Sequence, residues 1–187
     1  MPAVVIDAGC LSVPFLAANE DSMQARLMAV VAATAACRRN PEVRRLAEAM
    51  FGGAVRVELT HWTCAPILVS LETHLVNEGL GVSIGAGSDI ASECRRLVER
   101  LSGSVELEPG RGRFAGDQRD AAIQTAMLAG SETVISNHSR FRGDTVDTRI
   151  RVLSTDEFAA TVAFEWGIDL NEVDGTQLQD AFSLMFL

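Results

Sequence analysis

The chain of 187 residues contains neither lysine nor tyrosine, and all 16 of its basic residues are arginine. This bias is compatible with a GC-rich genome, and arginine also suits bidentate contacts with phosphate. The lack of tyrosine leaves few aromatic side chains for stacking on nucleic-acid bases, because only Phe114 and Phe141 lie in the arginine-rich part of the sequence. Any contact with nucleic acid is therefore expected to involve mainly its phosphates.

Long apolar runs, cysteine pairs and a serine-hydrolase motif are also absent. No stretch is apolar over the length of a bilayer and the N-terminus shows no signal-peptide pattern, so we expect a soluble, cytoplasmic protein with no membrane partner. The four cysteines include no C-x-x-C pair and the three histidines show no metal-type spacing, which argues against zinc and a redox dithiol. The motif G-x-S-x-G does not occur.

Negative charge is concentrated near the C-terminus. In residues 1–155 there are 18 acidic residues and 16 arginines, whereas residues 156–187 hold seven acidic residues and no basic one. Residues 111–151 contain seven arginines against five acidic residues. The overall net charge of −9 therefore does not exclude binding to nucleic acid.

Strand and helix patterns alternate along the chain. Apolar and alternating runs predict strands over residues 3–6, 55–59, 105–107, 133–136 and 150–153. Apolar stripes predict helices over residues 21–37, 42–51, 65–77, 88–101 and 117–129, with Thr60 or Thr63 capping the third helix and Ser88 the fourth. This order predicts a three-layer α/β/α sandwich with a central parallel sheet.

Three aspartates lie at the ends of these elements. Asp7 ends the first strand, and Asp117 and Asp120 lie in the first turn of the helix over residues 117–129. Parallel sheets bind their ligands beyond the carboxyl ends of the strands, where several carboxylates can hold a divalent cation against phosphate oxygens. The alternative is that Asp7 caps the segment after it and the other two complement the helix dipole.

Four short motifs occur in an order typical of one family. They are V-V-I-D at the first strand, D-A-A-I-Q-T-A-M-L-A-G in the helix, T-V-I-S-N-H-S-R-F after it, and I-R-V-L-S-T-D-E-F at the last strand. The chain thereby resembles the PIN domain, the fold of VapC-type toxins and other metal-dependent ribonucleases. The resemblance implies a PIN-like domain over residues 1–158, with residues 159–187 as an acidic and apolar extension.

The resemblance also implies a set of metal ligands. PIN nucleases gather acidic residues around Mg²⁺ or Mn²⁺ to cleave phosphodiesters. Matched by position, the catalytic and metal-binding residues would be Asp7, Glu72, Asp117 and Asp120. For Glu72 the alternative is a solvated charge on a helix face.

Two positions depart from the family pattern. The first acid is commonly followed by a hydroxyl residue and Asn, whereas this chain has Ala8 and Gly9. After the fourth strand the family often has T-x-D, whereas here Asn137 and His138 follow Ser136. In an active enzyme Asn137 or His138 would orient water or substrate.

Arginines surround these motifs in the sequence. Arg113, Arg119, Arg140 and Arg142 could position RNA phosphates, and the alternative is an ordinary solvated surface.

Two functions from different classes follow. The first is a metal-dependent ribonuclease acting as the toxin of a toxin–antitoxin pair, with RNA as substrate and a cognate antitoxin as partner. The second is a PIN-like module that binds RNA or protein without catalysis. The apolar segment over residues 181–187, with Phe182, Met185 and Phe186 at helical spacing, predicts docking on the domain or in a homodimer.

Overall fold

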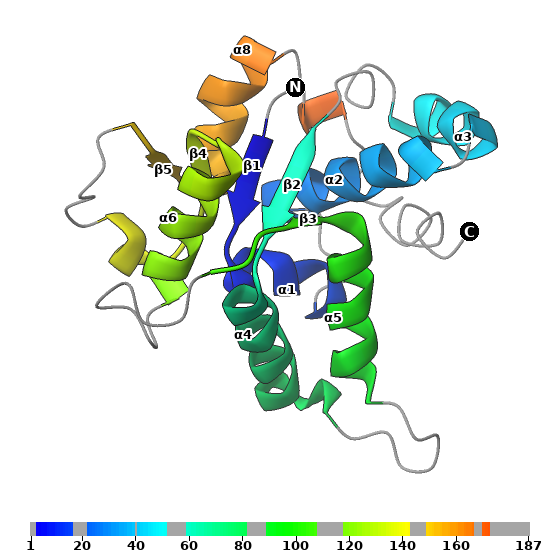
Figure 1. Ribbon diagram of the computed structural model, residues 1–187. Helices are drawn as coiled ribbons and strands as arrows, with labels where there is room; N and C mark the ends of the chain where they lie inside the picture. The colour runs from blue at the N-terminus through cyan, green and yellow to red at the C-terminus, as the bar shows by residue number, and fades with distance from the viewer. Residues whose placement is uncertain are drawn as a thin grey trace. The chain divides into compact units, whose positions relative to one another are not determined.

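The computed structural model describes residues 3–16, 22–39, 41–51, 59–81, 89–107, 118–142, 149–166 and 170–172 (Figure 1). The chain divides into two compact units. The sheet unit comprises residues 3–12 and 61–152, and the helical unit comprises residues 1–2, 13–60 and 153–187. The predicted domain over residues 1–158 and its extension stay a prediction.

The fold is α/β, with a central five-stranded parallel sheet flanked by helices, as predicted. Its order is β3-β2-β1-β4-β5. The strands are β1 (Ala3–Ile6), β2 (Thr60–Thr63), β3 (Gly103–Ser104), β4 (Thr133–Ile135) and β5 (Arg151–Leu153).

Two strand pairs show the parallel register. In the β1–β4 pair, Val5 lies beside Val134, and both side chains are fully buried. In the β2–β3 pair, Trp62 lies beside Gly103. A Cβ atom at Gly103 would be only 2.6 Å from Cε3 of the Trp62 ring, so a larger residue there would force a shift. Short β-branched runs buried on both faces are typical of parallel sheets.

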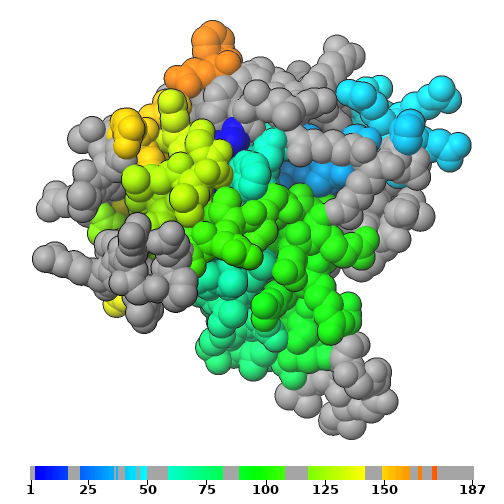
Figure 2. All heavy atoms as spheres, in the orientation of Figure 1, coloured from blue at the N-terminus to red at the C-terminus, as the bar shows by residue number. Residues whose placement is uncertain are grey.

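Helices α4 (Ala65–Leu75), α5 (Ile90–Leu101) and α6 (Gln118–Ala129) belong to the sheet unit. Helix α4 packs against α5 and α6, while α6 packs against β1 and β4. Figures 1 and 2 show α4 and α5 side by side. The π-turn η2 (Val76–Leu80) extends α4, and the 3₁₀ turn η3 (Ser139–Arg142) follows β4. Helix α1 (Ala8–Leu16) begins directly after β1.

The helical unit is built around α2 (Met23–Arg39), which packs against α3 (Pro41–Phe51) and α7 (Thr155–Glu157). From Ala25 to Ala33 every residue of α2 except Arg26 is buried. The unit also holds η4 (Phe158–Val162), α8 (Ala163–Trp166) and η5 (Leu170–Glu172). None of the helices in the described ranges has the length and apolar character to cross a membrane.

Helix caps follow the sequence in part. The hydroxyl of Ser22 accepts from the backbone N–H of Ala25 at 3.2 Å and caps α2. The cap of α5 is Asp89, which accepts from the N–H of Ala91 at 3.1 Å, so the prediction of Ser88 was wrong. Aspartate and serine cap helices about equally well, so the sequence did not separate the two neighbours.

The second and third strands begin elsewhere than predicted. Thr60 lies within β2 rather than capping α4, and Cys64 occupies the cap position without a side-chain hydrogen bond. Residues 55–58 of the predicted strand are outside the described ranges. Strand β3 begins two residues before the prediction, although the N–H of Val105 still donates to the Thr63 carbonyl at 3.0 Å.

Candidate active site

Asp7 is the buried acid at the carboxyl end of β1. Its side chain is only 3% exposed, and its backbone N–H donates to the carbonyl of Ile135 on β4 at 3.0 Å. Oxygen Oδ1 accepts from the N–H of Cys10 at 2.7 Å, which makes Asp7 the N-cap of α1. Asp7 therefore has the capping role that the sequence offers as the alternative to metal binding.

The second carboxylate oxygen of Asp7 is bound by Ser136, the first residue after β4. The Ser136 hydroxyl donates to Oδ2, and Ser136 itself is fully buried. The same hydroxyl oxygen accepts from the backbone N–H of His138 at 3.1 Å. The chain of bonds from His138 through Ser136 holds the Asp7 carboxylate in one orientation, as outer-shell partners do for metal-binding carboxylates.

Asp120 lies in the first turn of α6 and is partly exposed. Helix α6 connects β3 to the parallel strand β4, so its first turn lies at the carboxyl edge of the sheet. A hydrogen bond between Thr125 of α6 and Cys64, just after β2, ties the helix to this edge. Asp7 and the first turn of α6 thus lie at the same edge of the sheet, and a shared site of Asp7 and Asp120 stays a prediction. Asp117 is outside the described ranges.

Glu72 has partners that the sequence did not reveal. Arg95 of α5 donates to its Oε2 at 2.6 Å, and the Ser92 hydroxyl donates to Oε1 at 2.9 Å. The bond from Arg95, followed by the one from Ser92, lowers the pKa of the Glu72 carboxyl. The described contacts therefore link Glu72 of α4 to α5. Its role as a metal ligand stays a prediction.

Asn137, His138 and Arg140 are exposed in the segment after β4. Nδ1 of the His138 imidazole accepts from the N–H of Arg140 at 3.2 Å, and its ring meets Phe141 edge-on at 6.5 Å. Because Nδ1 is occupied, Nε2 is the ring nitrogen left for water or substrate. Arg119 is partly exposed beside Asp120, while the Arg113 and Arg142 side chains lie outside the described set.

A hard cation at this edge would have few protein ligands among the described residues. Across the described residues, no three or more Asp, Glu, His or Cys side chains lie together in a metal-binding group. Mg²⁺ usually keeps several waters and needs only one or two carboxylates. Asp7 offers lone pairs beyond its two hydrogen bonds, because an ionised carboxylate has about four acceptor positions.

Ser136 is the functional candidate that the sequence reasoning overlooked. It is a hydroxyl residue directly after a predicted parallel strand, and the carboxyl ends of such strands share one edge with Asp7. This position in the sequence could have identified Ser136 as a candidate site residue. Ser136 provides a hydroxyl next to the Asp7 carboxylate.

Together the fold and this edge define an α/β protein with a buried, hydrogen-bonded carboxylate at the end of its first strand. No protein-family profile matches the sequence, and no curated protein or solved structure matches it significantly. The function is therefore argued from the residues of the site.

Proposed function

We propose that the protein is a PIN-type, metal-dependent ribonuclease that hydrolyses RNA phosphodiesters in the cytoplasm as the toxin of a toxin–antitoxin pair. The observation that carries this proposal is the Asp7 carboxylate, buried at the end of β1 and oriented by Ser136 and the N–H of Cys10. Burying a carboxylate is costly, and a plain helix cap does not need a buried one. The choice of family and of reaction in this proposal comes from the resemblance of the sequence motifs to the PIN domain.

In this proposal Asp7, Asp117 and Asp120 would hold one Mg²⁺ or Mn²⁺ together with waters. The cation would supply charge stabilisation for the scissile phosphate and a lower pKa for attacking water. Ser136 keeps the Asp7 carboxylate in place. His138 presents Nε2 to water or phosphate, and Arg140 and Arg119 add positive charge for RNA phosphates.

Cleavage assays on substituted proteins test the proposal. With a fluorescent RNA and Mn²⁺, Asp7→Asn and Asp120→Asn should each remove cleavage, while Glu99→Gln, an exposed acid on α5, should cleave like the parent. Full cleavage activity in both aspartate variants would contradict the nuclease proposal. Calorimetric titration with Mn²⁺ gives a separate readout, since binding should disappear in Asp120→Asn.

The toxin role has its own test. Induced expression of the parent protein in bacteria should arrest growth, and Asp120→Asn should not. Co-expression with the protein encoded next to the gene should restore growth and yield a stable complex. If cells that express an active nuclease grow normally, the toxin role is excluded. The proposed catalytic activity is not affected by that result.

One observation favours the non-catalytic alternative. Both Asp7 oxygens already have hydrogen-bond donors, and Glu72 is paired with Arg95. A PIN-like module that binds RNA or protein needs no cation. RNA binding that is lost on Arg140→Gln, combined with no heat of Mn²⁺ binding and no cleavage, would establish the module in place of the enzyme.

A further inference from the structure

His138 is an exposed residue whose position is fixed by three hydrogen bonds. Its backbone N–H donates to the Ser136 hydroxyl oxygen at 3.1 Å, and its carbonyl accepts from the N–H of Phe141 at 3.0 Å. Nδ1 of its imidazole accepts from the N–H of Arg140 at 3.2 Å. Exposed side chains usually exchange between rotamers, so this ring is held more firmly than its exposure requires.

The ring of Phe141 adds a fourth contact. Phe141 is only 4% exposed and anchors the 3₁₀ turn η3, and its ring meets the imidazole edge-on with the two centroids 6.5 Å apart. The backbone of His138 is also joined to the Asp7 carboxylate, through two successive hydrogen bonds that share the Ser136 hydroxyl. The imidazole is therefore an oriented group in the segment that carries the candidate active site.

The hydrogen bond from Arg140 determines which nitrogen of the imidazole carries hydrogen. A backbone N–H can only donate, so Nδ1 accepts with its lone pair and has no hydrogen. A neutral imidazole has one N–H group, which is then at Nε2. The nitrogen that His138 offers to a ligand is thus a hydrogen-bond donor and not an acceptor.

We propose that His138 binds RNA by donating a hydrogen bond from Nε2 to a phosphate oxygen, and that it is not the base for the attacking water. This role rests on the proposed nuclease function and selects one of the two ligands named there. Nε2–H has no free lone pair, so it cannot take a proton from water. A phosphate oxygen carries negative charge and accepts strongly. Arg140, exposed on the same turn, adds positive charge for the same ligand.

The position of His138 makes this donor a property of the chain itself. The PIN pattern has an acid there, which would accept hydrogen bonds or bind a cation. Phosphate contacts also carry no information about the bases. The contribution of His138 to RNA affinity should therefore be equal for RNAs of different sequence.

Two substitutions of His138 separate the donor from the turn that holds it. In His138→Gln the amide nitrogen takes about the place of Nε2 and still donates, but the acceptor for the Arg140 N–H is lost. In His138→Asn the amide oxygen takes about the place of Nδ1 and still accepts that N–H, but no donor reaches as far as Nε2.

Fluorescence anisotropy with a labelled single-stranded RNA in EDTA measures affinity without cleavage. His138→Asn should weaken binding about tenfold or more, because a hydrogen bond to a charged group is lost. His138→Gln should recover most of that loss. His74→Asn, in the last turn of α4, is the matched histidine control and should bind like the parent.

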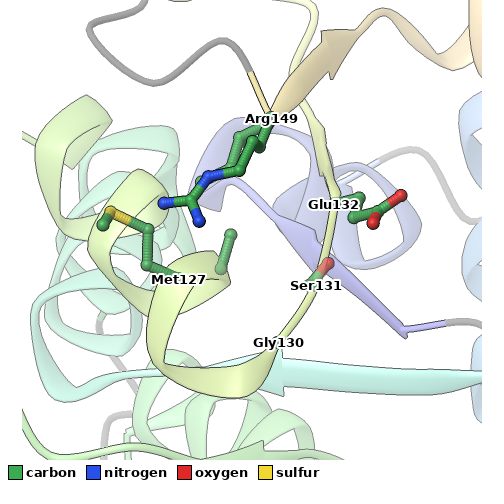
Figure 3. A pocket seen from close by; sticks show the side chains of 7 residues that line it. Met127, Gly130, Ser131, Glu132 and Arg149 are labelled. Atoms are coloured by element: carbon green, nitrogen blue, oxygen red, sulfur yellow. The ribbon is translucent and has the colours of Figure 1, made fainter.

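Arg149 is the control for general attraction between arginine and RNA. It is exposed and lines a pocket of about 240 Å³ at the last turn of α6, where Figure 3 shows its side chain extending toward Met127. The pocket lies where β4 and β5 begin, at the opposite edge of the parallel sheet from His138. Arg149→Gln should therefore bind the RNA like the parent.

Nuclear magnetic resonance of histidine-labelled protein gives a readout that needs neither metal nor cleavage. With the ring neutral, the nitrogen shifts of His138 should show the hydrogen on Nε2, and that signal should move when the RNA is added. Hydrogen on Nδ1 overturns the proposal, and so does a parent that does not bind the RNA.

The order of the two variants gives the remaining outcomes. Parental affinity in His138→Asn, or weaker binding by His138→Gln than by His138→Asn, would limit His138 to holding the turn and overturns the donor. Loss of cleavage in His138→Gln with binding retained would mean proton transfer and overturns it too. Failure of the nuclease proposal is recognised separately, because it is tested by cleavage in Asp7→Asn and Asp120→Asn.

Discussion

The Ser136 hydroxyl donates a hydrogen bond to the Asp7 carboxylate and thereby joins the carboxyl ends of β1 and β4. The two residues are 129 positions apart in the sequence, and both are buried. The Ser136 oxygen also accepts from the N–H of His138. One hydroxyl therefore orients the acid of β1 and the polar segment after β4.

Substitution of Ser136 by Ala should affect both stability and the proposed activity. It leaves a buried carboxylate oxygen and the N–H of His138 without this partner, at a cost of about 1–3 kcal/mol in the free energy of unfolding. Mn²⁺ affinity should fall about 10- to 100-fold, as for other outer-shell partners. Urea denaturation and calorimetry measure the two effects. Ser136→Thr retains the hydroxyl and should recover most of both, and an Ala variant with parental Mn²⁺ affinity would contradict the positioning role.

The two roles of Asp7 can be separated by comparing two substitutions. Asparagine caps helices about as well as aspartate, so Asp7→Asn should keep the α1 cap. The free energy of unfolding should therefore fall little through this effect. Asp7→Ala removes the cap and the acceptor for Ser136, and should cost about 1–2 kcal/mol. Both variants should lack cleavage if the carboxylate holds the cation. Equal stability of the two variants, measured by urea denaturation, would show that the Cys10 bond does not contribute to folding.

The Glu72–Arg95 pair should stabilise the packing of α4 on α5. A double-mutant cycle with Glu72→Gln and Arg95→Gln should give a coupling of about 0.5–1 kcal/mol. The Glu93–Arg96 pair is the matched control, because its 2.7 Å contact is similar but its side chains are more exposed, and its coupling should be smaller.

The same pair predicts a dependence on pH. The folded pKa of Glu72 is lowered from 4.5, so its contribution is present above that value and is lost as the pH falls through the lowered value. Urea denaturation of Glu72→Gln should show a smaller loss of stability in acid than the parent. An identical acid dependence in both proteins would mean that the pair has no net effect on folding.

His61 should make the protein less stable as the pH falls below neutrality. The imidazole is 2% exposed in β2, and its Nδ1 is 2.7 Å from the Ser102 hydroxyl oxygen. That hydroxyl donates to the Val98 carbonyl at 2.7 Å, so Nδ1 carries the hydrogen. Nε2 has no hydrogen-bond partner within the described part of the chain. Burial lowers the pKa of His61 from 6.5 to about 4.

Because the folded pKa is lowered, the unfolded chain binds the proton first. The contribution of neutral His61 to the free energy of unfolding is then complete above pH 6.5 and declines as the pH falls toward about 4. Between about pH 7 and about pH 5 the free energy of unfolding should fall by roughly 2 kcal/mol from this residue. Urea denaturation at both pH values measures the change. His61→Phe should remove most of that dependence, and an unchanged slope would show that His61 is not its source.

The class of fold and the first strand could be predicted from the sequence because they depend on local patterns. The β-branched run over residues 3–6 and the alternation of strands with helices suffice for a parallel sheet. Pro41 starts α3 because its ring favours the first helical turn and its missing N–H is not needed there. The position of Asp7 at a strand end was readable for the same reason.

The tertiary structure alone decided which groups these residues bind. The partners of Asp7 and Glu72 come from segments 129 and 23 positions away, and no local pattern reports such a pairing. Strand β2 was also located by its pairing with β3, because Thr60–Thr63 contains strand-favouring Thr and Trp but lacks the apolar run that marks the first strand. Long-range hydrogen bonds and burial therefore determined the chemistry around the acids, while local periodicity determined the order of the elements that carry them.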